Sequence, residues 1–213
     1  MEENTANQAQ AETEWEIDNL PNRLTLFRVA LIPIIIGSLY LNLLDFPWLY
    51  GMKQTLCYIA AWTFVAASIT DFFDGYIARK RNIVTMFGSF LDPIADKFLI
   101  VSSLIVLQAL ERIPVLVVII LVLREIYITA LRLLASDKGL VVPVGQLGKW
   151  KTAFQMFGIG FLMAYDDPYG IPMILLGNIF IYLASIFSIY SALEYTLGMW
   201  RKLKIKREEA RGR

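Results

Sequence analysis

Four aspartates lie in one short stretch of a very apolar chain, at Asp71, Asp74, Asp92 and Asp96. The first two are three residues apart, and the last two are four residues apart. In a helix, either spacing places both members of a pair on one face, with about 5–6 Å between their Cβ atoms. The chain contains no histidine, which removes the commonest general base and a frequent metal ligand. Acid–base chemistry must then use carboxylates, lysine, tyrosine or water.

Four carboxylates that converge on one place repel each other strongly unless they are protonated or neutralised by cations. Oxygen ligands without histidine or cysteine favour a hard divalent cation such as Mg²⁺ or Mn²⁺. Two such ions would balance the four carboxylates. The aspartate pairs therefore predict a site for two divalent ions.

Small and basic residues between the two pairs suggest what the ions would hold. Gly75 and Ala78 leave one helix face without bulk, so that a planar group or a phosphate can approach the backbone. Arg79 can hold a phosphate with its planar guanidinium. Gly88 clears the start of the next predicted helix, where free N–H groups favour an anion. Together these residues predict a pyrophosphate site.

The elements that must position these residues are apolar segments, because the 213-residue chain is 57% hydrophobic. A membrane-spanning helix needs about 20 mostly apolar residues. We predict an all-α integral membrane protein with six transmembrane helices, preceded by a short N-terminal surface helix at 19–28 that has Pro21 near its start. The predicted spans are 29–46, 55–73, 88–110, 114–134, 152–165 with the preceding turn, and 171–199.

Charge divides the chain into three parts. Residues 1–18 are polar and predict a disordered extension, 19–200 predict the membrane domain, and 201–213 form a basic tail with seven Lys or Arg residues. Because basic residues favour the cytoplasmic side, both termini and the aspartate stretch are predicted to be cytoplasmic. The tail either binds anionic lipid headgroups or is solvated and disordered. With 20 basic and 19 acidic residues, nothing in the balance suggests nucleic acid as a partner.

The aspartate stretch follows the pattern Asp-x-x-Asp-Gly-x-x-Ala-Arg, then eight residues, then Gly-x-x-x-Asp-x-x-x-Asp. At every one of these positions it resembles the signature of the CDP-alcohol phosphatidyltransferase family. The resemblance implies a homodimeric enzyme of the cell inner membrane that moves a phosphatidyl group from CDP-diacylglycerol to an alcohol and releases CMP.

The same resemblance implies roles for individual residues. Asp71, Asp74 and Asp92 would be the main metal ligands, with Asp96 near the second ion. Asp96 would also be the base that takes the proton of the acceptor hydroxyl, unless it is only a ligand. The residues that would bind the CDP-lipid are Gly75, Ala78, Arg79 and Gly88, together with Asn22 and Thr25 of the N-terminal element.

Two arginines bear on the choice of acceptor. Arg124 and Arg132 are eight residues apart, so they share a face of one predicted span, where ionisable groups are costly and usually face a cavity or a partner. A second anion pocket near the aspartates would suit an acceptor that carries its own phosphate. Segments 19–34, 123–134 and 145–156 resemble bacterial family members that use glycerol 3-phosphate as acceptor. This resemblance assigns the acceptor phosphate to Arg124, Arg132 and Lys149, and we expect the nearby basic residues Arg28 and Lys151 to bind it as well.

Simpler roles for these residues also fit the sequence. Arg124 could pair with Glu125 or with an aspartate, and the two lysines could extend to the membrane surface beside a helix start. Asn22 and Thr25 could satisfy backbone groups, and Arg28 could extend to the surface as well.

Other functions remain open at this point. Serine or an inositol phosphate could be the acceptor. A prenyltransferase would use the same metal logic but would leave Gly75, Ala78, Arg79 and Gly88 unexplained. A cation transporter would place its carboxylates near the middle of broken spans, whereas these aspartates cluster near predicted span ends beside basic residues.

Overall fold

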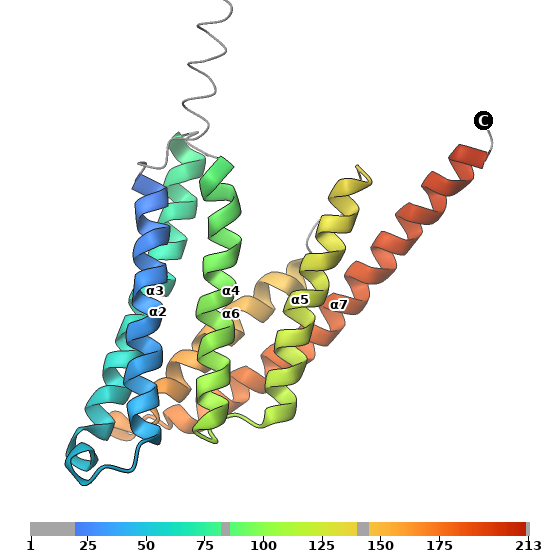
Figure 1. Ribbon diagram of the computed structural model, residues 1–213. Helices are drawn as coiled ribbons and strands as arrows, with labels where there is room; N and C mark the ends of the chain where they lie inside the picture. Colours follow the sequence, from blue (N-terminus) through green and yellow to red (C-terminus); the bar gives the residue numbers. More distant parts are fainter. Residues whose placement is uncertain (1–19, 82–85, 140–144, 212–213) are drawn as a thin grey trace, which may run out of the picture. The chain divides into compact units, whose positions relative to one another are not determined.

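The computed structural model of the protein describes residues 20–81, 86–139 and 145–211 (Figure 1). Its regular elements over these residues are helices, with no β-strand among them. The predicted extension at 1–18 lies outside the described residues. The α-helices are α2 (Leu20–Leu43), α3 (Lys53–Arg81), α4 (Met86–Ala109), α5 (Val115–Asp137), α6 (Gln146–Ala164) and α7 (Met173–Arg211), and the short 3₁₀ helices are η1 (Pro47–Met52) and η2 (Pro168–Gly170).

The predicted all-α class is confirmed, and each predicted span falls mainly within one of these α-helices. By length and apolar composition alone, two segments of the described helices could cross a membrane, Asn22–Leu43 and Met173–Lys206. Large apolar side chains are exposed on several helices, among them Trp62, Leu116 and Phe157. Exposed apolar surface of this kind suits contact with lipid better than contact with water. The six-span arrangement itself stays a prediction.

The start of the described chain differs from the prediction of a separate surface helix at 19–28. From Leu20 the chain forms one continuous helix to Leu43, with no break near Arg28. No glycine or turn dipeptide separates the two predicted segments, so the helix has no reason to end there. Pro21 lies in the first turn, where its missing N–H costs no helical hydrogen bond.

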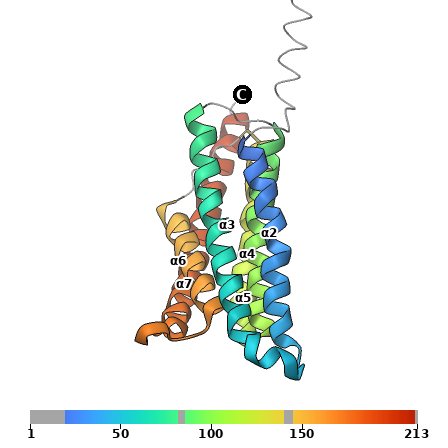
Figure 2. The same cartoon turned by 90° about the vertical axis from the view of Figure 1, so that its left-hand side faces the viewer.

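The chain divides into two compact units between Leu110 and Glu111, and each is described by itself. In the first unit α2 packs against both α3 and α4, and both views show the three helices side by side (Figures 1 and 2). The packing is dense: Ile35 and Leu39 of α2, Phe64 of α3 and Leu99 of α4 are almost fully buried. This core holds the three helices of the first unit together.

In the second unit α6 packs closely along α7, and two glycines allow the approach. A Cβ atom added at Gly158 would lie 2.6 Å from Cγ1 and 3.0 Å from the backbone N of Ile181. A Cβ atom added at Gly177 would lie 2.7 Å from Cγ of Leu162. Such contacts are shorter than van der Waals distances, so the close spacing of the two helices requires glycine at both positions.

This packing predicts that the same glycine-to-alanine substitution has different effects on thermal stability at two positions. We expect Gly158→Ala to lower the melting temperature of the purified protein, because overpacking costs about 1–3 kcal/mol and outweighs the better helix propensity of alanine. Gly37→Ala in α2 is the matched control, because no atom lies within 4 Å of its added Cβ. The control should melt no lower than the unsubstituted protein. Equal melting temperatures for the two variants would contradict the close packing.

Helix α7 is the longest element, with 39 residues, or about 58 Å at 1.5 Å per residue (Figure 1). It packs against α5 through a buried cluster of Ile128, Ala135, Tyr195 and Met199. Residues 201–211, predicted as a tail, continue this helix. The described part of the tail is therefore a helical extension rather than disordered chain.

Candidate active site

A buried arginine joins two of the predicted metal ligands in the first unit. Arg28 of α2 has no exposed surface, and its Nη1 lies 2.8 Å from Oδ1 of Asp71 on α3. The same Nη1 donates a hydrogen bond to Oδ1 of Asp96 on α4. One turn earlier on α2, the Thr25 hydroxyl donates to Oδ1 of Asp92 at 2.5 Å. Side chains of α2 therefore hold carboxylates of α3 and α4 in one cluster.

The cluster keeps an excess of negative charge, since two carboxylates contact the one guanidinium and a third, that of Asp92, accepts only from the neutral Thr25 hydroxyl. The side chains of Asp71 and Asp96 are 29% and 42% exposed, so a ligand can reach them. The oxygen atoms of this cluster belong to carboxylates and to the Thr25 hydroxyl, and such oxygen ligands suit a hard divalent cation. Arg28 already bridges two of these carboxylates as a cation would. Among the described side chains, no three acidic groups lie close enough together to hold a metal ion by themselves. The side chain of Asp74, a further predicted ligand, is not among those described. The residues present fit a divalent ion.

Several predicted residues of this stretch lie outside the described side chains. Their backbone belongs to the end of α3 and the start of α4, and their assigned roles stay predictions. They are Asp74, Gly75, Ala78, Arg79 and Gly88.

The N-terminal residues are placed more fully than the sequence allowed. The simpler role for Arg28, extension to the membrane surface, is wrong, because its side chain is fully buried between two carboxylates. Thr25 binds a carboxylate of another helix rather than serving only its own backbone. Asn22 is buried as well. These residues lie about one turn apart along α2.

The second unit contains a cavity of about 310 Å³ that is lined by both predicted arginines of α5. Arg124 and Arg132 thus share a face of α5, as the eight-residue spacing predicted. The Arg132 guanidinium lies 6.0 Å from the ring centre of Tyr195, at the outer limit for a cation–π contact. The remaining lining residues are Ile128, Gly145, Gly148, Ser191, Glu194, Gly198 and Lys202.

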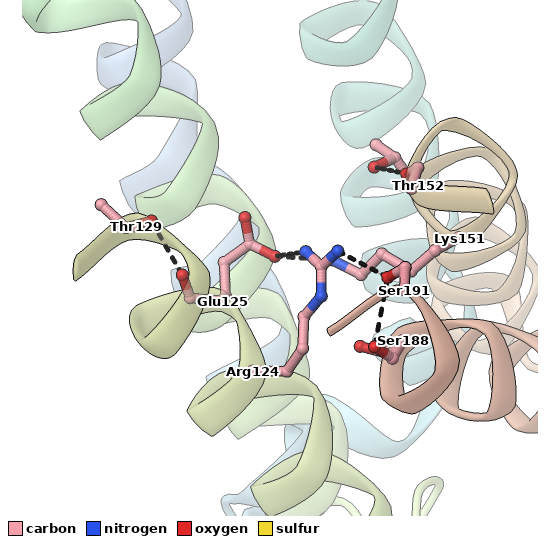
Figure 3. A network of polar contacts seen from close by, with 8 residues as sticks. Arg124, Glu125, Thr129, Lys151, Thr152, Ser188 and Ser191 are labelled. Atoms are coloured by element: carbon pink, nitrogen blue, oxygen red, sulfur yellow. Dashed lines mark hydrogen bonds and ion pairs between the residues drawn. The ribbon is translucent and has the colours of Figure 1, made fainter. Parts of the chain in front are cut away.

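Hydrogen bonds on two sides hold the Arg124 guanidinium (Figure 3). Its Nη1 lies 3.3 Å from Oε2 of Glu125, and its Nη2 donates to Oγ of Ser191 on α7 at 2.8 Å. The buried Lys151 of α6 donates to the same Oε2 at 2.6 Å. Glu125 therefore binds cations from two helices through one oxygen. The simpler role for Arg124, pairing with Glu125, is present, and the arginine lines the cavity as well.

The other residues assigned to the acceptor phosphate are more scattered. Lys151 is buried beside the cavity and bonded to Glu125, whereas Lys149 is exposed and does not line the cavity. Arg28 belongs to the carboxylate cluster of the first unit. Of the five residues predicted to bind the acceptor phosphate, two line this cavity.

The sequence prediction missed the contribution of α7. Each of its cavity-lining residues lies three or four positions from another of them, which places them on one helix face: Ser191, Glu194, Tyr195, Gly198 and Lys202. A signal was present, because a glutamate inside a predicted span is costly and often functional.

Comparison with known proteins places the chain among lipid-forming transferases. The family model for CDP-alcohol phosphatidyltransferase matches residues 18–190. A protein of Bacillus subtilis named CDP-diacylglycerol–glycerol-3-phosphate 3-phosphatidyltransferase is 38% identical over 193 residues, which cover 87% of this chain and 97% of that protein. Proteins of the same name from Haemophilus influenzae and, with the number 2 added, Arabidopsis thaliana are each 37% identical. The match to the Haemophilus influenzae protein covers 83% of this chain and 91% of that protein. The match to the Arabidopsis thaliana protein covers 88% of this chain and 82% of that protein.

Proposed function

The chain belongs to the CDP-alcohol phosphatidyltransferase family, and we propose that it transfers the phosphatidyl group of CDP-diacylglycerol to a hydroxyl of glycerol 3-phosphate. The products are phosphatidylglycerophosphate and CMP. The observation that carries this proposal is the 38% identity along 97% of a relative named for this reaction. The family also sets aside the prenyltransferase and transporter alternatives.

The carboxylate cluster supports the donor half of the reaction. Asp71, Asp74 and Asp92 would be the main ligands of two divalent ions, Mg²⁺ or Mn²⁺, with Asp96 near the second ion. Bound there, these ions would supply the positive charge that neutralises the pyrophosphate and the departing CMP. Arg28, fully buried, keeps Asp71 and Asp96 together. The CDP-lipid would be held by Arg79, against the small residues Gly75, Ala78 and Gly88, with Asn22 and Thr25 nearby.

In the chemical step, an oxygen–phosphorus bond forms between the acceptor hydroxyl and the phosphatidyl phosphorus. The bond from that phosphorus to the bridging oxygen breaks, and CMP leaves with the electron pair. Asp96 takes the proton of the attacking hydroxyl. Its partial exposure, together with the hydrogen bond from Arg28, fits a carboxylate that is ionised and accessible.

The cavity of the second unit supports the acceptor half. Arg124 and Arg132 would bind the phosphate of glycerol 3-phosphate, because guanidinium groups match phosphate oxygens in geometry and charge. Lys149 and Lys151 would add positive charge nearby. An inositol phosphate also carries a phosphate, so it is the acceptor that must be compared directly, with serine as the acceptor without one.

The family and the apolar helices indicate a membrane protein. We further propose a multi-pass arrangement in the cell inner membrane, with both termini and the active site in the cytoplasm, and a homodimer as the working unit. The concentration of basic residues in the tail and after Ala78 supports this orientation.

The proposal is tested by following CMP release from CDP-diacylglycerol with purified protein. Release should require glycerol 3-phosphate, should be slow with serine or inositol phosphate, and should stop with EDTA and resume with Mg²⁺ or Mn²⁺. Faster release with serine or inositol phosphate would transfer the proposal to that acceptor. Full activity in EDTA would contradict the assignment of the aspartates.

A further inference from the structure

The anion-binding cavity of the second unit contains one carboxylate among its described lining residues, that of Glu194. It lines the same 310 Å³ cavity as Arg124 and Arg132. A carboxylate in this place repels a bound phosphate, so the charge is unfavourable unless it binds something else. Among the described residues, the Glu194 carboxylate has no hydrogen bond or ion pair, although two arginines share its cavity.

The Glu194 carboxylate lies close to the residue that precedes α6. A Cβ atom added at Gly145, the residue before α6, would lie 2.6 Å from Oε2 of Glu194. A larger residue at this position would displace the flexible end of the Glu194 side chain from where it lies. The carboxylate therefore sits against the start of α6, at the edge of the cavity.

The acceptor itself presents a group that needs such a partner. Glycerol 3-phosphate has two hydroxyls, of which one attacks and the other keeps its proton. Arginine and lysine side chains can only donate hydrogen bonds, so they cannot accept that proton. The Ser191 hydroxyl accepts from Arg124 and donates to the carbonyl of Ser188, so it is already engaged on both sides (Figure 3). Among the described charged side chains that line the cavity, Glu194 alone can accept a hydrogen bond from that hydroxyl.

We propose that Glu194 determines acceptor specificity by accepting a hydrogen bond from the hydroxyl of glycerol 3-phosphate that does not react. This inference rests on the proposed function and names a further residue of the same site.

The experiment compares two acceptors that differ in one group. 3-Hydroxypropyl phosphate keeps the phosphate and the terminal hydroxyl of glycerol 3-phosphate but lacks the middle hydroxyl. The unsubstituted protein should prefer glycerol 3-phosphate about tenfold to hundredfold in kcat/KM, the usual range for a hydrogen bond to a charged group. In Glu194→Ala this preference should fall to about threefold or less, because only glycerol 3-phosphate loses a contact. Glu194→Gln, which keeps the shape and one acceptor oxygen, should be intermediate.

Glu208→Gln is the matched control, because Glu208 lies on the same helix and is largely exposed outside the cavity. It should keep the full preference. If Glu194→Ala does not fold, Glu194→Gln carries the comparison. Equal losses on both acceptors, or an unchanged preference, would overturn the role of Glu194 while leaving the proposed function intact. A protein that does not use glycerol 3-phosphate at all would instead overturn the proposed function.

Discussion

Replacing Asp96 with asparagine is expected to lower kcat about 10²- to 10⁴-fold, the usual contribution of a positioned general base. Asparagine keeps the size of the side chain and can still accept from Arg28, but it cannot take the proton of the acceptor hydroxyl. The KM for CDP-diacylglycerol should stay within about threefold, because the loss falls on the chemical step. Steady-state kinetics with both substrates varied give the two constants.

Two further variants separate a base from a metal ligand. Asp71→Asn should raise the KM for CDP-diacylglycerol as well as lower kcat, because Asp71 is assigned to the ions that hold the donor. Asp137→Asn, at the exposed end of α5, should behave like the unsubstituted protein. If Asp96→Asn loses donor affinity as Asp71→Asn does, Asp96 is a ligand and the proton has another acceptor.

The second large effect is expected at the cavity of the second unit. Arg124→Ala and Arg132→Ala should each lower kcat/KM for glycerol 3-phosphate about tenfold to hundredfold, because a charge-assisted phosphate contact contributes about 1.5–3 kcal/mol. The KM for CDP-diacylglycerol should change little. Arg124→Lys should recover only part of the loss, since one ammonium group cannot replace a planar fork bonded to both Glu125 and Ser191.

Arg201→Ala is the control, because Arg201 is exposed on α7 and does not line the cavity. Its kinetics should match those of the unsubstituted protein. Glycerol, which lacks the phosphate, should be a poor acceptor, and Arg132→Ala should discriminate less between glycerol and glycerol 3-phosphate. A change in donor affinity alone would contradict the assignment of these arginines to the acceptor.

Local patterns predicted much of the fold and part of the site. Helices and their approximate bounds follow from long apolar runs, and the shared face of Arg124 and Arg132 follows from helical spacing within one element. Each of these predictions depends on residues that are close in sequence.

What the sequence could not provide are contacts between elements. Nothing near Arg28 in the chain shows that it bridges carboxylates 43 and 68 residues away. The face that α7 contributes to the cavity was missed for the same reason, since Glu194 gains a role only through α5 and the start of α6. The helix boundary predicted after Arg28 failed because amphipathic and apolar segments can share one helix when no turn residue separates them.

The central claim is direct transfer of the phosphatidyl group to a hydroxyl of glycerol 3-phosphate. It is tested most directly with glycerol 3-phosphate that carries ¹⁸O in its hydroxyl groups, incubated with CDP-diacylglycerol and purified protein. Mass spectrometry should find phosphatidylglycerophosphate that retains the label in the new phosphodiester, together with unlabelled CMP in equal amount. CMP release without labelled phosphatidylglycerophosphate would contradict this account.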